Sequence, residues 1–372
     1  MKASSAPKKK IFITGPHLDN FGGVANYYNA IIPELRKFDH LDIEYHSVGS
    51  PAASRNIYLH WVNDQFRTYR AMNSIRPDLV LVNPSLNFKS FIRDALITLS
   101  AVMLSAKVVV FYRGWDVNFE KKIDRYFMGL FRKTFAKANS AIVLASDHGK
   151  RLQSWGVACP IFKESTTVAN HISLVAEEAV ARRFEIESKP LRVLFLSRIE
   201  KAKGIYETID SVSSVAKKGM PIKLTIAGEG SESAEIRRYI KKVNLDDFVF
   251  VAGYLKGEQK RQALFSHDVF CLPTKHGEGM PNSVLEAMMS GLVVLTSKYG
   301  GIKDFFQDGK MGYLVDPDDK GEIVHHLETL AENRVLCREI GLYNHDFAMK
   351  NFASPIVVQR LCNIFDGLLK GV

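Results

Sequence analysis

The sequence predicts an α/β protein of two domains, each a doubly wound parallel sheet with helices on both faces. Short apolar runs alternate with longer segments of helical spacing, which is the pattern of parallel β–α–β units. The alternation weakens over the charged stretch 173–190 and then starts again, so the 372 residues contain two such halves. We expect a first domain over 1–172, a second over 190–350, and a final helix over 351–372 that packs back on the first domain.

The first half begins with the strand IFITG (11–15) and the glycine-rich turn NFGGVANYY (20–28), which leads into a helix. Further strands of this half are predicted at 78–84, 107–114 and 140–146. In the second half, strands are predicted at 191–197, 222–228, 248–253, 268–274, 292–297 and 312–316. Sheets of this kind bind ligands at the carboxyl ends of their strands, so functional residues are expected in the loops that follow the strands.

The composition limits the possible functions. The formal net charge of +10 favours anionic partners, which include nucleic acid, acidic lipid and phosphorylated small molecules. The four cysteines lie far apart without metal-ligand spacing, as expected for reduced thiols in a cytoplasmic protein. The segment IFIT is too short for the core of a signal peptide, and the longest apolar run, 95–106, is shorter than the roughly 20 residues that cross a bilayer. We therefore expect a cytoplasmic protein that does not span a membrane.

Several well-known motifs are absent from the sequence. No G-x-G-x-x-G follows the first strand, and the chain has no G-x-x-x-x-G-K-[ST], H-E-x-x-H or G-x-S-x-G. The segment AGEGSES (227–233) has two glycines of a dinucleotide fingerprint and lacks the third. The sequence therefore does not support a dehydrogenase, a P-loop kinase, a zinc protease or a serine hydrolase by the main motif of each class.

The stretch HGEGMPNSVLEAMMSG (276–291) carries one glutamate in a loop and a second in a predicted helix. This helix is expected to begin at Pro281 or Asn282, which suit a first turn and a cap, and to end at Gly291. Glu286 lies among apolar residues, so we expect it in a shielded place, although a lone glutamate is more often exposed. A shielded carboxylate needs a partner that the neighbouring sequence does not supply. Near a helix N-terminus it can accept two hydrogen bonds from a vicinal diol such as a ribose.

The loop before this helix offers a second group of contacts. Glu278 stands after the end of a strand, where it can reach another hydroxylated or charged group. The backbone N–H groups of Gly279, Met280 and Asn282 are expected beside it, at the open end of the helix. Such helix ends bind anions and sugar hydroxyls.

Two basic residues occupy the matching loop after the first strand of the second half. The segment SRIEKAKG (197–204) places Arg198 and Lys203 between a strand and a helix. Two cations that converge at strand ends suit a diphosphate. Taken alone, they could be ordinary surface charges. Their coincidence with the two glutamates favours a binding site.

These segments together resemble a known family. SRIEKAKG, AGEG, VAGYL, HGEGMPNSVLEAMMSGLVVLTSKYGGIKDFFQDGKMGYLV and, in the first half, FGGVANY resemble the successive motifs of the family-four retaining glycosyltransferases (glycosyl transferases group 1). The family has the GT-B fold, in which two Rossmann-like domains face each other across a cleft. The resemblance covers nearly all of the second domain. In the first domain it rests on Gly22, Gly23 and FYRGWD (111–116).

The resemblance implies a nucleotide-diphospho-sugar donor, most readily a UDP-sugar. It assigns the ribose to Glu286 and the diphosphate to Arg198 and Lys203. The residues that it assigns to the donor sugar are Glu278, Gly279, Met280, Pro281 and Asn282. It also implies that Gly22 and Gly23 let the backbone of the first domain approach the phosphates, although a tight turn between strand and helix explains the same glycines.

Two positions depart from the family pattern. Where the family often has a histidine that contacts the reacting sugar, this chain has Arg113, which keeps a cation in that place. Asp116 follows it and is carried over only weakly. Asp304 stands where the family tends to have glutamate.

The segment 119–137 has helical spacing and a basic face. Ile123, Phe127, Leu130, Phe131 and Phe135 form its apolar face, and Lys121, Arg125 and Arg132 fall on another face. The simpler interpretation is a helix that packs on the core and presents a solvated face. The alternative is a segment that docks on an acidic membrane surface, where lipid-linked acceptors are found.

The sequence thus predicts a retaining glycosyltransferase that moves a sugar from a nucleotide donor to a glycan or lipid-linked acceptor. No Asp-x-Asp motif is evident, and neither a metal nor another cofactor is expected. A nucleotide-sugar epimerase or a sugar phosphorylase on the same fold is an alternative. A basic module that binds nucleic acid is a second alternative, but an aromatic stacking platform and a basic recognition helix are missing from the sequence pattern.

Overall fold

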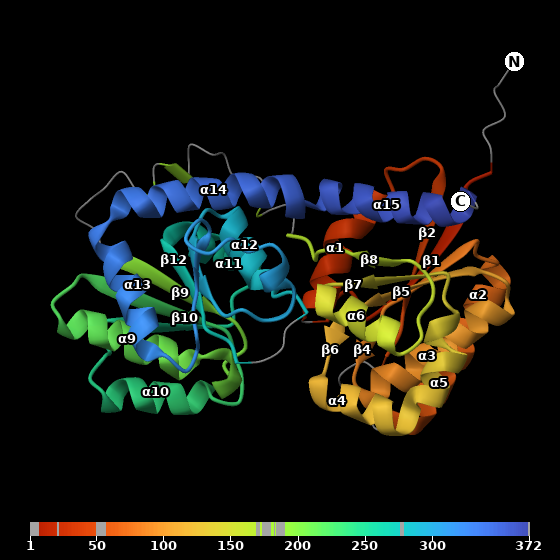
Figure 1. Ribbon diagram of the computed structural model, residues 1–372, viewed down its shortest axis with the longest axis horizontal. Helices are drawn as coiled ribbons and strands as arrows, with labels where there is room; N and C mark the ends of the chain where they lie inside the picture. The colour runs from red at the N-terminus through yellow and green to blue at the C-terminus, as the bar shows by residue number, and fades with distance from the viewer. Residues whose placement is uncertain are drawn as a thin grey trace, which may run out of the picture. The chain divides into compact units, whose positions relative to one another are not determined.

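A computed structural model describes residues 7–20, 22–49, 57–168, 190–275 and 279–370, together with residues 172, 180, 181 and 183 (Figure 1). The chain forms two compact units. The first contains Met1–Ala169, Gly277–Met280 and Ser354–Val372. The second contains Asn170–His276 and Pro281–Ala353.

The first unit is built on a six-stranded parallel sheet of order β2-β1-β3-β5-β7-β8. Its strands are β1 (Lys9–Gly15), β2 (Leu41–Ser47), β3 (Leu79–Val82), β5 (Lys107–Tyr112), β7 (Ser140–Val143) and β8 (Ile161–Lys163). A separate two-stranded ladder joins β4 (Ser85–Leu86) to β6 (Gly114–Trp115). The helices are α1 (Gly23–Leu35), α2 (Ile57–Ile75), α3 (Phe88–Met103), α4 (Val117–Lys122), α5 (Met128–Lys133), α6 (Ser146–Ser154) and α15 (Ser354–Lys370).

Both faces of this sheet are buried, which explains its uninterrupted apolar strands. Along β3, Val80 and Val82 belong to one core cluster, which also contains residues of α3 and α5. Leu79 and Leu81 point to the opposite cluster, which contains residues of α1 and α15. The C-terminal helix α15 therefore supplies part of the core of the first unit.

The second unit repeats this architecture with the strand order β11-β10-β9-β12-β13-β14, again all parallel. Its strands are β9 (Leu191–Leu196), β10 (Ile222–Ala227), β11 (Val249–Gly253), β12 (Val269–Leu272), β13 (Val293–Thr296) and β14 (Gly312–Leu314). Its helices are the 3₁₀ turns η3 (Lys201–Lys203) and η4 (Gly300–Asp304), with α9 (Ile205–Lys217), α10 (Ser233–Lys242), α11 (Gly257–Ser266), α12 (Asn282–Met289), α13 (Lys320–Glu332) and α14 (Arg334–Phe352).

The ten strands predicted from the sequence are all present. The sequence pattern did not predict β2 and β8, the two edge strands of the first sheet, or the two-residue strands β4 and β6. Residues of β2 alternate between buried and exposed over its first half, and β8 has three residues of which two are exposed. Short or half-polar edge strands lack the continuous apolar run that identified the others.

The sequence predicted one continuous helix over 119–137, and this prediction is wrong. The segment consists of α4, a π-helical turn η1 (Ile123–Phe127), α5 and a 3₁₀ turn η2 (Phe135–Lys137). Its apolar residues Ile123, Phe131 and Phe135 are fully buried in the core, as the simpler interpretation expected. Phe127 and Leu130 are partly buried and pack against the same cluster, so the predicted apolar face is correct although the helix is interrupted.

A buried ion pair fastens the amino-terminal edge of the second sheet. Asp268, which is fully buried, accepts hydrogen bonds from the backbone N–H of Arg192 (2.9 Å) and from Nη2 of its guanidinium (2.8 Å). Nη2 of Arg334, at the start of α14, lies 3.3 Å from the same carboxylate. These contacts link β9, β12 and α14.

We expect Asp268→Asn to lower the free energy of unfolding by about 3–5 kcal/mol, because breaking a buried pair leaves two guanidinium groups without their counter-charge. Urea unfolding followed by circular dichroism measures the change. Asp346→Asn is the matched control, because its i,i+4 pair with Lys350 is exposed and should be worth less than about 0.5 kcal/mol. Equal effects of the two substitutions would contradict this structural role.

Candidate functional site

Glycines bring three loops together at the carboxyl edge of the second sheet. A Cβ atom on Gly228 would lie 1.9 Å from the carbonyl oxygen of Ser197, and one on Gly230 would lie 2.3 Å from that of Ile199. Gly204 has φ +76°, and its Cβ would lie 2.1 Å from the carbonyl oxygen of Pro273. Only glycine permits such approaches. The AGEG motif is thus explained by packing of the β10 loop against the loop that carries Arg198.

Hydrogen bonds hold these loops in register. The N–H of Ile199 donates to the carbonyl of Glu229 (3.1 Å), and the N–H of Glu232 donates to the carbonyl of Ile199 (3.0 Å). The N–H of Lys275, after β12, donates to the carbonyl of Ala202 (2.7 Å). The segment 197–204 is therefore clamped between its neighbours on both sides.

The two predicted phosphate ligands lie in this clamped segment but in different environments. The side chain of Arg198 is 64% exposed and pairs with Glu200 at 2.8 Å. Lys203 is only 2% exposed. Burial, followed by the nearby positive charge of Arg198, lowers the pKa of Lys203 to about 8. The structure thus brings the two cations into electrostatic contact, and Lys203 is not the ordinary surface charge that the alternative interpretation required.

The helix of the central motif forms as predicted. Pro281 is the N-cap residue of α12, and Gly291 follows its C-terminus with φ +71°. The N–H of Gly291 donates to the carbonyl of Met288 (2.9 Å), and that of Leu292 to the carbonyl of Ala287 (3.0 Å), which is a Schellman motif. This ending fixes the helix that carries Glu286.

Glu286 is buried, and its partner was not predicted from the sequence. Glu286 is 5% exposed, and Nζ of Lys260 from α11 lies 2.6 Å from each of its two carboxylate oxygens. Lys260 precedes the apolar residues Ala263 and Leu264 by three and four positions, so it shares their helix face, but this spacing does not indicate which residue that face meets. The partner comes from 26 residues earlier in the chain.

The loop between β12 and α12 is anchored where it starts. Nζ of Lys275 lies 3.0 Å from a carboxylate oxygen of Glu207 in α9 and 2.5 Å from one of Asp318. Glu278 lies outside the described residues, so its predicted contact with the donor sugar stays a prediction. Met280, after it, packs against the core of the first unit.

In the first unit, the glycine turn precedes α1, and Arg113 packs against Tyr27 of this helix. Gly22 precedes α1 with φ +147°, and no side chain caps the helix. The guanidinium of Arg113 lies 3.8 Å from the ring centre of Tyr27 in α1 and 4.5 Å from that of Phe111. Burial lowers the pKa of Arg113. Its Nη2 donates to Thr166 at 3.4 Å, whereas Nε and Nη1 have no hydrogen-bond partner among the described residues.

Asp116 has a local structural role. Its Oδ1 accepts hydrogen bonds from the N–H groups of Asn118 (2.8 Å) and Phe119 (3.3 Å), so it is the N-cap residue of α4. A capping carboxylate of this kind explains the residue without a ligand. Asp304 ends the 3₁₀ turn η4.

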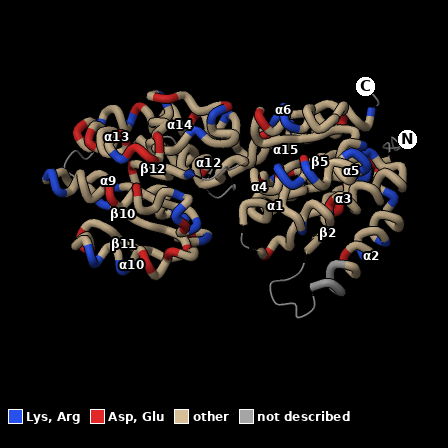
Figure 2. The backbone as a smooth tube through the Cα atoms, turned by 60° about the horizontal axis from the view of Figure 1, so that its bottom comes forward, with Lys and Arg blue, Asp and Glu red and all other residues tan. Residues whose placement is uncertain are grey.

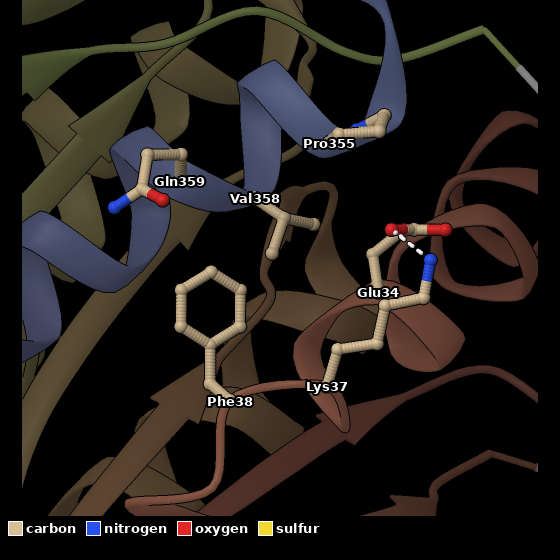
Figure 3. Close-up of a pocket in the computed structure, with 6 residues that line it drawn as sticks. All are labelled: Glu34, Lys37, Phe38, Pro355, Val358 and Gln359. Atoms are coloured by element: carbon tan, nitrogen blue, oxygen red, sulfur yellow. Dashed lines mark hydrogen bonds and ion pairs between the residues drawn. The ribbon is translucent and has the colours of Figure 1, made fainter.

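A surface hollow of about 290 Å³ lies between α1 and α15, at the end of α1 opposite to the glycine turn (Figure 3). Its lining residues are Glu34, Lys37, Phe38, Pro355, Val358 and Gln359. The charged residues in its lining are Glu34 and Lys37, which form an ion pair at 2.7 Å. The hollow contains none of the predicted site residues.

Within the described parts of the chain, no helix combines the length and hydrophobicity of a membrane span, and no cluster of three acidic, histidine or cysteine side chains has metal-binding geometry.

Comparison with known proteins shows what the second unit is similar to. Residues 177–346 match the family model of glycosyl transferases group 1. WcaL of Escherichia coli strain K12, a glycosyltransferase named for colanic acid biosynthesis, is 23% identical over 235 residues, which cover 62% of this chain and 56% of WcaL. The poly(ribitol-phosphate) α-N-acetylglucosaminyltransferase of Staphylococcus aureus is 30% identical over 173 residues, which cover 46% of this chain and 34% of the relative. This chain therefore spans little more than half the length of WcaL.

Solved structures agree on the fold. Anabaena HepE in complex with UDP and glucose superposes with a TM-score of 0.72 at 15% identity, covering 96% of this chain and 99% of HepE. Sucrose-phosphate synthase of Thermosynechococcus elongatus gives a TM-score of 0.76 at 15% identity, with 98% and 100% covered. The two parallel α/β units thus form a GT-B fold, as predicted from the sequence. Residues 177–346, a little less than half of the chain, are similar to the glycosyl transferases group 1 family.

The depressed pKa of Lys203 predicts a pH-dependent affinity for nucleoside diphosphate. Below pH 8 the ammonium is charged and can bind phosphate; above its pKa of about 8 the free protein must take up a proton first. Because the phosphates of UDP are already ionised at pH 7 (pKa about 6), UDP affinity should fall from pH 7 to pH 9. Isothermal titration calorimetry in buffers of different ionisation enthalpy detects the proton uptake.

Lys203→Arg keeps a cation that does not titrate in this range, so it is the matched control and should give a flat pH profile. Lys203→Ala and Arg198→Ala should each weaken UDP binding by about 1.5–3 kcal/mol, the range for hydrogen bonds to charged groups. If the UDP affinity of the unmodified protein did not change between pH 7 and pH 9, the proposed contact between Lys203 and the phosphates would be wrong.

Proposed function

We propose that this protein is a retaining glycosyltransferase that transfers a sugar from a UDP-sugar to an acceptor hydroxyl. The observation that carries this proposal is the carboxyl edge of the second sheet, where Arg198 and Lys203 lie in one clamped loop and Glu286 in α12. Two cations suit the diphosphate, and a shielded carboxylate suits the ribose diol. The complex of HepE with UDP supports the choice of base.

The chemistry requires positioning and charge stabilisation. The bond between the anomeric carbon and the diphosphate oxygen breaks, and the acceptor oxygen bonds to the same face of that carbon. The acceptor proton passes to the departing phosphate oxygen. Arg198 and Lys203 stabilise the negative charge that develops on the diphosphate. This same-face route needs no carboxylate beneath the sugar, in contrast to a double displacement.

The acceptor is proposed to be a glycan or a lipid-linked glycan. The name of WcaL refers to colanic acid biosynthesis and that of the Staphylococcus aureus relative to poly(ribitol-phosphate), which supports a polymeric acceptor. A panel of UDP-sugars with glycan acceptors, assayed for acceptor-dependent release of UDP, tests the activity. The anomeric proton coupling of the product, measured by NMR, tests retention. UDP release without acceptor, or exchange of the sugar within the donor, would favour a hydrolytic or epimerase activity instead.

The positive charge does not by itself favour nucleic acid. Figure 2 shows lysine and arginine on helices and strands of both units. Several of these cations are engaged in ion pairs, such as Arg192 with Asp268 and Lys260 with Glu286. The proposal therefore includes no nucleic-acid partner.

The two glutamates of the central motif are proposed to act on different parts of the donor. Glu286→Gln should weaken the binding of donor and of free UDP alike, because the ribose does not react. Glu278→Gln should leave UDP affinity nearly unchanged and lower the turnover, because the interaction that it removes is one with the sugar. Calorimetry gives the affinities, and the transfer rate at saturating donor gives the turnover. The reverse pattern of effects would refute this assignment.

We further propose that the protein associates with anionic membranes through α4 and η1. Because Ile123, Phe131 and Phe135 are in the core, the apolar residues that remain exposed here are Val117 and Tyr126. Lys121, Lys122 and Arg125 are exposed beside them. A combination of exposed apolar and basic side chains suits an acidic lipid surface.

Lys122→Gln combined with Arg125→Gln should reduce co-sedimentation with anionic vesicles, with binding weaker by about 1 kcal/mol for each basic residue. Arg132 is unsuitable for this test because its Nε donates to the carbonyl of Trp155 at 3.4 Å. Lys241→Gln combined with Lys242→Gln, in α10, makes the same charge change in the other unit and is the control. If phosphatidylcholine vesicles bind the protein as well as anionic vesicles do, the membrane proposal is wrong.

A further inference from the structure

The ion pair between Lys260 and Glu286 is a shielded contact between α11 and α12, both in the second unit (Figure 1). Glu286 is 5% exposed, and the side chain of Lys260 is 19% exposed. A charged pair in such a place stabilises a fold poorly, because desolvation offsets much of the attraction. Apolar residues of similar size would pack α11 on α12 at least as well. The pair therefore calls for an explanation other than stability.

The hydrogen bonding of the carboxylate is incomplete. Oε1 accepts a hydrogen bond from Nζ of Lys260 at 2.6 Å. Oε2 is equally close to Nζ, yet it accepts no hydrogen bond of good geometry from any described residue. A carboxylate oxygen that is buried without a donor is costly to the folded state. Such an atom indicates that a donor from outside the chain completes the arrangement.

The neighbouring cation on α11 shows that the pairing is selective. Arg261 is directed to Glu258 in its own helix, with Nε and Nη2 2.7 and 2.8 Å from the two oxygens of that carboxylate. Glu258 is exposed, and the side chain of Arg261 is 37% exposed. Of these two adjacent basic residues, only Lys260 reaches into the shielded region to Glu286.

We infer that Lys260 is a positioning residue, which holds Glu286 so that Oε2 accepts hydrogen bonds from the ribose diol of the bound nucleotide. The inference rests on the proposed function, which assigns the ribose to Glu286. The ammonium keeps the carboxylate charged in its shielded place and occupies one of its oxygens. Without the ammonium, the carboxylate has no counter-charge to keep it there and turns toward water. Lys260 itself need not touch the nucleotide.

The experiment compares UDP with 2′,3′-dideoxy-UDP, which lacks both ribose hydroxyls, by calorimetry. The unmodified protein should bind UDP about tenfold or more tightly than the dideoxy compound, as expected for hydrogen bonds to a charged group. Lys260→Met removes the ammonium and keeps an apolar stem. It should lower the affinity for UDP about tenfold and change the affinity for the dideoxy compound less than about twofold. The preference for the compound with ribose hydroxyls then disappears.

Three further variants sharpen the test. Lys260→Arg should restore a large part of the ribose preference, because it returns a cation to α11. Arg261→Met is the matched control and should change neither affinity. Glu286→Gln should abolish the preference by itself, and adding Lys260→Met to it should weaken UDP no further, since both substitutions act on one interaction.

The possible failures are distinguishable. Equal weakening of both ligands by Lys260→Met would overturn the inference and leave Lys260 a purely structural residue. If the unmodified protein bound both ligands equally, the assignment of ribose to Glu286 would be wrong and the inference with it. If UDP did not bind at all, the proposed donor would be refuted as well. Should Lys260→Met fail to fold, as judged by circular dichroism, Lys260→Arg and Glu286→Gln still decide, because a ribose preference that persists in Glu286→Gln overturns the inference.

Discussion

The close approach of backbone segments at the carboxyl edge of the second sheet is the constraint on which the candidate site depends. Gly228, Gly230 and Gly204 each lie where a Cβ atom would be within 2.3 Å of a neighbouring carbonyl oxygen. Without these glycines the loops after β9, β10 and β12 could not pack together, and Arg198 and Lys203 would lose the clamped segment that holds them. Glycines, which have no side chain, therefore position the charged side chains at this edge of the sheet.

This packing also explains why charged side chains of the site are shielded. The loops exclude water from Lys203, and the apolar helix α12 does the same for Glu286. A shielded charge interacts more strongly with a ligand than an exposed one does, because the local dielectric constant is lower. Shielding also destabilises the charged form of each side chain. It lowers the pKa of Lys203, and Glu286 needs the counter-charge that Lys260 supplies. Arg198, which is exposed and paired with Glu200, keeps its freedom to move toward a ligand.

The sequence predicted the ten strands, the helix over Asn282–Met289 and the shielding of Glu286, because each is encoded in local pattern and turn chemistry. It could not predict Lys260 as the partner of Glu286, since that contact joins two helices through their tertiary packing. The π-helical turn at Ile123–Phe127 interrupts a helix whose spacing looked continuous. Arg113 was predicted as a cation near the donor; its burial against Tyr27 depends on how α1 lies over the sheet, which no local pattern specifies. Its role toward a ligand stays a prediction.

The segment that leads into α12 passes from one unit of the chain to the other. Gly277–Met280 belong to the first unit, whereas Pro281 and the whole of α12 belong to the second. Met280 packs against the core formed by α1 and α15, and the residues of α12 are buried in the second unit. Met280 and α12 are thus packed in two separate hydrophobic cores, although only Pro281 stands between them in the sequence.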